Sequence, residues 1–420
     1  MSVRDKQNKV VITGMGILAP NGKTIDDFWN ANIQGRSGIG QLTHFDSTPL
    51  KVHIAGEVKD FDPEQYMLPG VYRKIDRFAQ LGTAAANLAI EDAKITFKNS
   101  TSERTGIIIG SGLGGILFHE EQIITAYEKK FDWVASSAVP RISPNSVSSY
   151  IAMTFQIKGP NFTTSTACSS GANAIGQALY MLRSGIIDAC VAGGVEAPIT
   201  PVTFAAYQNL RAISRRNSVP AKASRPFDKE RDGFVLSEGA GILILETEEH
   251  AKKRGAKIYA ELLGFATNCG AYNMVAPQPD GVDAAHAMRS ALKDAGIEPE
   301  DIDYINAHGT STSFNDLAET RAIKEVFGGR AYKIPISSTK SMVGHSIGAS
   351  GGIEAIVSVL VISKKIIPPT INLENPDPEC DLDYVPNESR KTEVKTVMSN
   401  SFGFGSNNAV LIISRYGRGG

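Results

Sequence analysis

The sequence predicts an α/β fold in which helices cover a mixed or mostly parallel sheet. Apolar runs typical of strands alternate with segments of helical period throughout the chain. No low-complexity linker divides these segments, and two parts of the chain weakly resemble each other. The expected strands are Lys9–Thr13, Thr105–Ile109, Cys190–Gly193, Gly241–Glu246, Ile258–Thr267, Ile302–Asn306 and Val410–Ser414. The expected helices are Phe78–Ala93, Ser170–Arg183, Gly281–Ala295, Ser313–Phe327 and Ser350–Ser363.

The internal similarity indicates a duplicated half. A Ser-Thr pair and a glycine have the same spacing in Ser165–Gly171 and in Ser338–Gly344, and a small-residue apolar helix follows both. Repeated sequence indicates repeated supersecondary structure, although three shared residues could also arise by chance. The charged stretch 248–255 is the best internal boundary. It predicts an N-terminal half of residues 1–255 and a C-terminal half of residues 256–420.

Composition excludes several classes of protein. The chain has 420 residues, of which 42% are hydrophobic and 21% charged, as in a globular protein with a large core. Its 43 Lys and Arg against 44 Asp and Glu argue against a general nucleic-acid binder. Met1–Lys9 lacks the apolar stretch of a secretory signal, and apolar runs such as Ile353–Ile362 are expected to be too short and polar-broken to span a bilayer. We therefore expect a cytoplasmic protein with reduced thiols and no membrane.

Cys168 is the first candidate for catalysis, because it lies where a Thr-rich run gives way to a small-residue helix. Helix N-terminal N–H groups favour a thiolate and could hold the oxyanion formed when a thiol attacks a thioester. The alternative is a buried structural cysteine. The four cysteines are far apart and form no C-x-x-C pair, so neither a zinc site nor a dense disulfide framework is expected.

Two histidines lie in glycine-punctuated turns. His308 follows an apolar strand, and His345 follows Gly344 five residues after Lys340. Two imidazoles could stabilise a developing carboxylate or enolate by donating hydrogen bonds, without acting as general bases. For His308 the alternative is a cap on the next helix. No Cys or carboxylate lies at ligand spacing, so we expect no metal site. If the two halves are equivalent, Cys168 and the turn at His345 face one shared cleft.

Two glycine-rich segments complete the pattern. Asn400–Asn408 interleaves glycines with Phe402 and Phe404, which would allow backbone to approach a ligand while the rings cover it. Gly110–Gly115 matches G-x-G-x-x-G after a strand. No second strand ending in Asp or Glu follows at the required distance, so close helix–sheet packing is expected there rather than dinucleotide binding.

Taken together, these motifs resemble the β-ketoacyl-acyl carrier protein synthases, condensing enzymes of the thiolase superfamily. The resemblance runs from Val10–Gly16 to Asn400–Gly405 and includes Ser224–Val235 and Pro368–Leu373. It implies a duplicated, five-layered α-β-α-β-α thiolase fold. It also implies a homodimer, or a heterodimer with a chain-length factor, and no cofactor.

The resemblance implies a role for each candidate. Cys168 would accept an acyl chain from acyl carrier protein, and malonyl-acyl carrier protein would then lose carbon dioxide and attack that thioester. His308 and His345 would stabilise the enolate, with Lys340 ordering the site electrostatically. The N–H groups of Cys168 and Phe404 would form the oxyanion hole.

Further residues of this family concern access and docking. The gate would contain Phe404 and Phe402, and Leu113 matches a position that limits acyl-chain length. The family binds its acidic carrier protein on a basic patch, although ordinary solvated charge is the alternative reading for each candidate. The candidates are Arg73, Lys74, Arg77, Arg211, Arg215 and Arg216.

Some positions depart from the family pattern. Ser313 stands where Pro is usual, Ser406 and Asn407 replace Gly and Thr, and Val343 replaces Thr. They suggest a specialised polyketide or polyene pathway, so a ketosynthase subunit paired with a chain-length factor is the main alternative. The chain-length factor itself typically lacks the cysteine. A thiolase would need a second catalytic cysteine, and Cys380 does not fit.

Overall fold

Ten strands form one sheet in the computed structural model, which describes residues 8–98 and 100–417. Their order is β10-β9-β13-β14-β8-β1-β7-β6-β4-β5. The strands from the first part of the chain are β1 (Val10–Leu18), β4 (Thr105–Gly110), β5 (Asn161–Thr164), β6 (Ala189–Glu196) and β7 (Gly239–Thr247). Those from the second part are β8 (Ala260–Cys269), β9 (Tyr304–Asn306), β10 (Ile336–Ser337), β13 (Thr396–Gly403) and β14 (Asn407–Ser414).

The two series of strands repeat one topology. When the five strands of each series are numbered in chain order, both series have the same order from the edge of the sheet inward: third, second, fourth, fifth and first. The first three strands in that order are parallel, and the last two pairings are antiparallel, in both series. The series meet where β1 pairs with β8 through Val11 and Ile12. The fold is therefore duplicated, as expected; the division at residues 255 and 256 stays a prediction.

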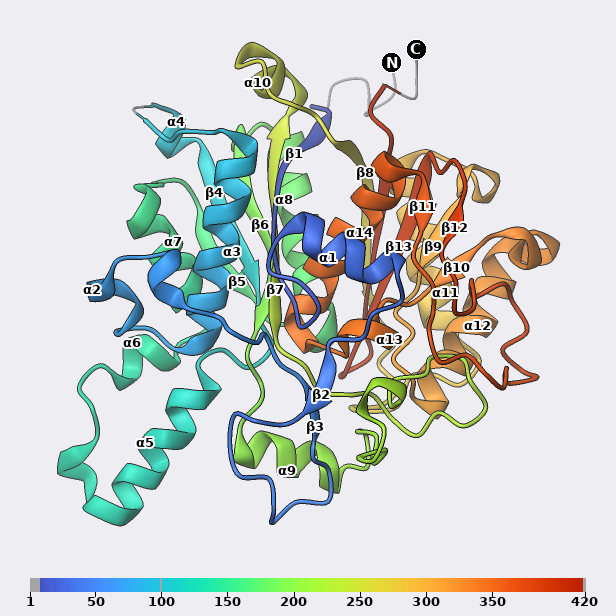
Figure 1. The fold of residues 1–420 in the computed structure, drawn as a ribbon. Coiled ribbons are helices and arrows are strands. Elements are labelled where there is room, and N and C mark those ends of the chain that lie inside the picture. Colours follow the sequence, from blue (N-terminus) through green and yellow to red (C-terminus); the bar gives the residue numbers. More distant parts are fainter. Residues whose placement is uncertain (1–7, 99, 418–420) are drawn as a thin grey trace.

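Helices alternate with the two series in five layers (Figure 1). On one outer face α3 (Arg77–Ala93) and α7 (Ser146–Phe155) pack together, and on the other α11 (Val282–Ala295) and α12 (Ser313–Phe327) do so. Between the two series lie α8 (Ser170–Arg183) and α14 (Ser350–Lys364), each of which contacts strands of both. This middle layer forms the largest apolar core.

Smaller elements surround this core. Two short two-stranded sheets are β2 (Ile39–Gln41) with β3 (Ile54–Gly56), and β11 (Ile366–Ile367) with β12 (Arg390–Lys391). The remaining α-helices are α1 (Ile25–Ile33), α2 (Pro69–Tyr72), α4 (Ser100–Glu103), α5 (Ile116–Lys129), α6 (Ala138–Ile142), α9 (Pro201–Asn209), α10 (Glu248–Lys253) and α13 (Lys340–Val343). In Figure 1, α5 projects away from the layered body.

The expected strands and helices all occur. The helices Ser170–Arg183 and Ser313–Phe327 have the expected bounds, and the other elements differ at one or both ends. The largest shift is in β1, which continues to Leu18 instead of ending at Thr13. This strand includes Gly14 and Gly16, and α3 packs so closely on it that neither position has room for a side chain. A Cβ at Gly14 would lie 2.4 Å from the carbonyl oxygen of Ala89. Strand β13 was not expected, since its polar residues Ser399, Asn400 and Ser401 break the apolar pattern although all are buried.

The expectation that no apolar segment is long enough to span a bilayer was wrong on length. Residues Ile347–Lys364 form one 18-residue helical segment of mean hydropathy 1.5. Of this segment 89% is buried inside the protein, because α14 is one of the two helices of the middle layer. A buried core helix can have the same length and hydropathy as a membrane-spanning helix. The segment Met1–Gln7, which bears on the secretory-signal expectation, lies outside the described residues.

Glycines bring the starts of α8 and α14 into close contact. A Cβ at Gly351 would lie 2.4 Å from the backbone nitrogen of Ala172, and one at Gly352 would lie 2.2 Å from the carbonyl oxygen of Gly241. A Cβ at Gly171 would lie 2.8 Å from the carbonyl oxygen of Gly348. Because no side chain separates these backbones, the segments just before the two helices meet at one place.

Substituting Gly352 with Ala should therefore destabilise the protein, because the added methyl group meets backbone that cannot rotate away. We expect a loss of about 2 kcal/mol in the free energy of unfolding, measured with denaturant. Gly329→Ala is the matched control, since a Cβ there meets nothing within 4 Å, and should change stability by less than about 0.5 kcal/mol. Equal effects of the two substitutions would contradict the close packing.

Candidate functional site

Cys168 lies in a tight turn between β5 and α8. Ala167 has a positive φ of 52°, and residues 167–169 form a 3-10 turn that runs into the helix. The hydroxyl of Ser170 donates to the carbonyl oxygen of Ala167 at 2.6 Å and accepts from the backbone N–H of Thr166 at 2.9 Å. Gly403 approaches from β13, where a Cβ would lie 2.7 Å from the carbonyl oxygen of Thr166. The turn is thus held from both sides, with the thiol buried.

Burial dominates the acidity of this thiol. Desolvation raises the pKa of Cys168 to about 12, against the lowering effects of the Lys340 charge and of backbone N–H groups of Phe404 and Cys168 itself. The backbone N–H groups lower the pKa of the thiol, as expected at a helix start, but the loss of hydration exceeds their effect. The two N–H groups that act on the sulfur are the pair expected for an oxyanion hole.

His308 is held in place by a buried carboxylate. It follows β9, and Glu319 of α12 accepts the backbone N–H groups of His308 and Gly309, both at 2.8 Å. The amide of Asn400 donates to the same carboxylate at 3.0 Å. His308 is therefore fixed by a loop-to-helix contact and does not cap the following helix, whose N-cap is Thr312.

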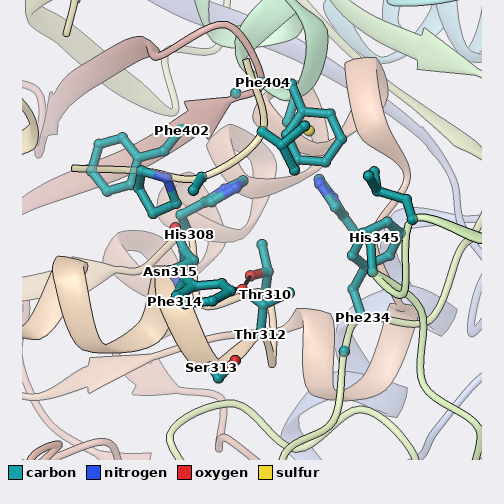
Figure 2. Close-up of a pocket in the computed structure, with 18 of the residues that line it drawn as sticks. Phe234, His308, Thr310, Thr312, Ser313, Phe314, Asn315, His345, Phe402 and Phe404 are labelled. Atoms are coloured by element: carbon teal, nitrogen blue, oxygen red, sulfur yellow. Dashed lines mark hydrogen bonds between the residues drawn. The ribbon is translucent and has the colours of Figure 1, made fainter. Parts of the chain in front are cut away.

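His345 is fixed through its ring and its backbone. Its N–H donates to the carbonyl oxygen of Val235 at 2.7 Å, and its Nδ1 lies 3.0 Å from the hydroxyl of Ser350. Its ring packs edge-to-face on Phe234 with centroids 5.1 Å apart. The anchored Nδ1 leaves Nε2 for the cavity, and Figure 2 shows His345 and His308 pointing toward each other below Phe404.

The two imidazoles form one neutral pair. Their ring centroids are 5.3 Å apart, with nearly perpendicular planes. Burial, followed by the positive charge of Lys340, holds the pKa of both His308 and His345 well below the usual range. Neutral rings can each offer one N–H donor without carrying charge.

A buried ion pair lies beside these rings. Lys340 of α13 contacts Glu354 of α14, and both side chains are almost completely buried. Desolvation raises the pKa of Glu354 to about 7, although the charge of Lys340 acts in the opposite direction. The second carboxylate oxygen of Glu354 and Nδ1 of His308 have no hydrogen-bond partner among the described residues.

These groups converge on a cavity of about 230 Å³. Cys168, His308 and His345 line it together with Phe402 and Phe404, whereas Lys340 lies outside its wall. Leu210, Arg211, Val275 and Phe314 also line it and are exposed, which places them toward its opening. Figure 2 shows Phe314 and Thr312 on the side of the cavity opposite Phe404.

Ser406, which stands where the family usually has glycine, connects the gate loop to the segment after β8 by hydrogen bonds. The Ser406 hydroxyl donates to the carbonyl oxygen of Asn273 at 3.0 Å and accepts from the N–H groups of Tyr272 and Asn273 at 3.3 and 3.2 Å. The N–H of Gly405 donates to Met274. A glycine at position 406 would lack all three side-chain contacts.

The basic candidates fall into two kinds. Arg77 forms a two-point ion pair with buried Glu238, at 2.7 Å for both contacts, so its charge is already paired within the protein. Arg216 lies near Glu230 and Asp232, at 3.4 and 3.7 Å. The candidates that remain exposed are Arg73, Lys74, Arg211 and Arg215.

The segment that carries Leu113 is bound to a buried carboxylate. The backbone N–H of Leu113 donates to Glu196 at 3.1 Å, and Glu196 also accepts from Gly112 and Gly348. The N–H groups of the segment after β4 are therefore bound to a buried carboxylate of β6. Leu113 is not among the residues that line the described cavity.

Three buried carboxylates that support the site were not identified from the sequence. Glu196, Glu319 and Glu354 each lie in the core and bind backbone or ammonium groups around the candidates. Glu354 carried a signal, because it is the lone charge in the apolar run from Ile353 to Ile362. Glu319 carried none, since α12 contains several other charged residues.

Comparison with known proteins covers nearly the whole chain. Residues 7–251 match the model of the "Beta-ketoacyl synthase, N-terminal domain", and residues 259–374 match that of the "Beta-ketoacyl synthase, C-terminal domain". The chain is 48% identical to a protein of Synechocystis sp. named 3-oxoacyl-(acyl-carrier-protein) synthase 2, over 98% of this chain and 99% of the relative. A protein of the same name from Coxiella burnetii is 46% identical over the same shares.

Solved structures agree in fold. A type II PKS ketosynthase bound to a hexaketide, in complex with its acyl-carrier protein, has a TM-score of 0.91 and 36% identity, covering 97% of this chain and 99% of that one. The ishigamide ketosynthase/chain length factor has a TM-score of 0.91 and 36% identity, covering 98% and 100%. Together with the duplicated fold and the Cys-His-His cavity, these similarities show that the chain belongs to the β-ketoacyl synthase family.

Proposed function

We propose that this protein is a β-ketoacyl-acyl carrier protein synthase that extends an acyl chain by decarboxylative Claisen condensation. The observation that carries the proposal is the convergence of one thiol and two neutral imidazoles on a single cavity lined by Cys168, His308 and His345. Relatives at 46% to 48% identity are named 3-oxoacyl-(acyl-carrier-protein) synthase 2.

In the first half-reaction, Cys168 takes the acyl group. Its sulfur forms a bond to the acyl carbon, the thiol of the carrier leaves, and the proton of Cys168 ends on that leaving sulfur. The N–H groups of Cys168 and Phe404 stabilise the oxyanion. Because the pKa of Cys168 is raised by burial, proton removal accompanies attack and no free thiolate accumulates.

In the second half-reaction, malonyl-acyl carrier protein loses carbon dioxide. The bond between the carboxylate and the α-carbon breaks, and its electron pair becomes an enolate whose oxygen is held by N–H donors of His308 and His345. The α-carbon then bonds to the acyl carbon, and the sulfur of Cys168 leaves as a thiolate that takes a proton from solvent water. The Lys340 ammonium, paired with Glu354, adds to the burial that keeps both imidazoles neutral, and it supports negative charge in the cavity.

The proposal includes partners and surroundings. Acyl carrier protein, which is acidic in this family, would dock on exposed cations, and Arg211 lies at the cavity opening. Leu113 would limit acyl-chain length from a part of the acyl pocket beyond the described cavity. The resident assembly would be a homodimer in the cytoplasm, with no cofactor.

A second candidate is the ketosynthase subunit of a type II polyketide or polyene system, acting as a heterodimer with a chain-length factor. The similarity at 36% identity to a ketosynthase bound to a hexaketide supports it. So does the polar Ser313 beside Phe314 at the opening, where the family usually has proline. Both candidates carry out the same bond changes.

Cys168→Ala should abolish formation of an acyl-enzyme, because no other side chain is expected to attack the thioester. After incubation with octanoyl-carrier protein, the mass of the intact wild-type protein should rise by one octanoyl group, and the added mass should be absent from the variant. Cys269→Ala is the matched control, since it removes the exposed thiol and should leave labelling intact. A label that persists in Cys168→Ala would reassign the nucleophile. Wild-type protein that forms no ketoacyl product after malonyl-acyl carrier protein is added would refute the function.

Reversing the charge of Arg73 and Lys74 to Glu should weaken binding of acyl carrier protein about fivefold, since exposed pairs each contribute little. The measurement is the dissociation constant at low and high salt, and the difference from wild type should shrink as salt rises. Lys391→Glu on β12, also exposed, is the control. An affinity equal to wild type at low salt would assign both residues to ordinary solvated charge.

A further inference from the structure

Tyr207 places an uncommitted hydroxyl in the cavity. Its side chain lines the same cavity as Cys168, and it is only partly exposed. Its hydroxyl has no hydrogen-bond partner among the described residues and keeps some exposure in the cavity. Burial raises the pKa of Tyr207, and the charges of Cys168 and Glu196 add to the rise. The group is therefore a neutral hydrogen-bond donor on the Cys168 side of the cavity.

The position of this hydroxyl is fixed by its helix. The carboxylate of Glu120 caps the start of α9 by accepting the N–H groups of Val202 and Thr203, at 3.0 and 3.1 Å. At the other end of α9, Gln208 accepts the N–H groups of Lys51 and Val52. A side chain on an element held at both ends has little freedom to move its hydroxyl to another partner.

The ring of Tyr207 is also held relative to the reacting groups. It packs edge-to-face on Phe234 with centroids 5.6 Å apart, and Phe234 packs on His345 at 5.1 Å. The rings of Tyr207, Phe234 and His345 therefore pack in a row, which fixes the position of the Tyr207 ring relative to His345. Phe234, Phe402 and Phe404 make much of the neighbouring wall apolar.

Several other polar groups of the cavity already have partners. Thr310 and Thr312 are hydrogen-bonded to each other at 2.9 Å. Ser406 bonds to the backbone of Asn273 at 3.0 Å, and the amide of Asn408 donates to Asn268 at 2.9 Å. Tyr207 thus offers a donor that nothing in the described protein satisfies, and a bound substrate can satisfy it.

We propose that Tyr207 is a specificity-determining residue whose hydroxyl donates a hydrogen bond to a carbonyl oxygen on the acyl chain carried by Cys168. The substrate class is then oxo-acyl thioesters, with the oxygen within the first few carbons of the thioester. A plain hydrocarbon chain covers the hydroxyl and leaves it without a partner, which costs free energy. A site built to bind an oxygen discriminates against the analogue that lacks it. This inference rests on the proposed function.

The test compares chains of equal length on acyl carrier protein. The probes are octanoyl-, 3-oxo-octanoyl- and 5-oxo-octanoyl-carrier protein, and the readout is the rate at which each acylates Cys168, followed by intact mass. Wild type should react about tenfold faster with one of the oxo-acyl probes than with octanoyl. Tyr207→Phe, which keeps the ring packing, should lose that preference while its rate with octanoyl stays equal or rises. Tyr332→Phe, which removes an exposed hydroxyl outside the cavity, should behave as wild type.

Three results would overturn the inference. They are a wild type with no preference, a Tyr207→Phe variant that keeps the preference, and a variant that slows all three probes equally while its unfolding midpoint matches wild type. The last would make Tyr207 a positioning residue for Cys168 or His345. Wild-type protein that accepts no acyl group from any probe would overturn the proposed function itself, which is a distinct outcome.

Discussion

The buried ion pair between Lys340 and Glu354 is the interaction on which the site depends. Its ammonium adds to the desolvation that keeps His308 and His345 uncharged, and it opposes the desolvation that raises the pKa of Cys168. A buried charge needs a paired partner, because an isolated one loses too much hydration. Glu354 supplies that partner from α14, one of the two helices of the middle layer. The same pair therefore acts, together with burial, on the pKa of every group proposed to act on substrate.

Duplication of the fold explains how these groups meet. Each series of strands has the same order, and each contributes one helix to the middle layer. The turn before α8 carries Cys168, and the turn before α14 carries His345. Because glycines at 171, 351 and 352 let the two helix starts touch, groups from opposite halves share one cavity. Neither half alone contains a complete site, so the chemistry proposed here requires the duplication.

The sequence predicted what short motifs determine and missed what distant contacts determine. Cys168, His308 and His345 were identified because glycines and small residues frame each one, and the structure brings all three together. Arg77 looked like a free cation, since its partner Glu238 lies 161 residues away and only the fold joins them. The position of Cys168 at a helix start could be inferred locally, whereas the burial that raises the pKa of its thiol is a property of the whole packed core. Leu113 was assigned to the acyl pocket by resemblance. Its place in a part of that pocket beyond the described cavity stays a prediction.

The most direct measurement of the central claim is the protonation of the two histidines. Carbon-13 labelling of histidine Cε1 allows NMR titration of each ring in the whole protein, with His308→Ala and His345→Ala used to assign the two signals. Because burial and the Lys340 charge lower both pKa values well below 6.5, neither signal should titrate between pH 8 and the onset of acid unfolding. Titration of either ring near its usual value, in folded protein, would contradict the account of two neutral donors.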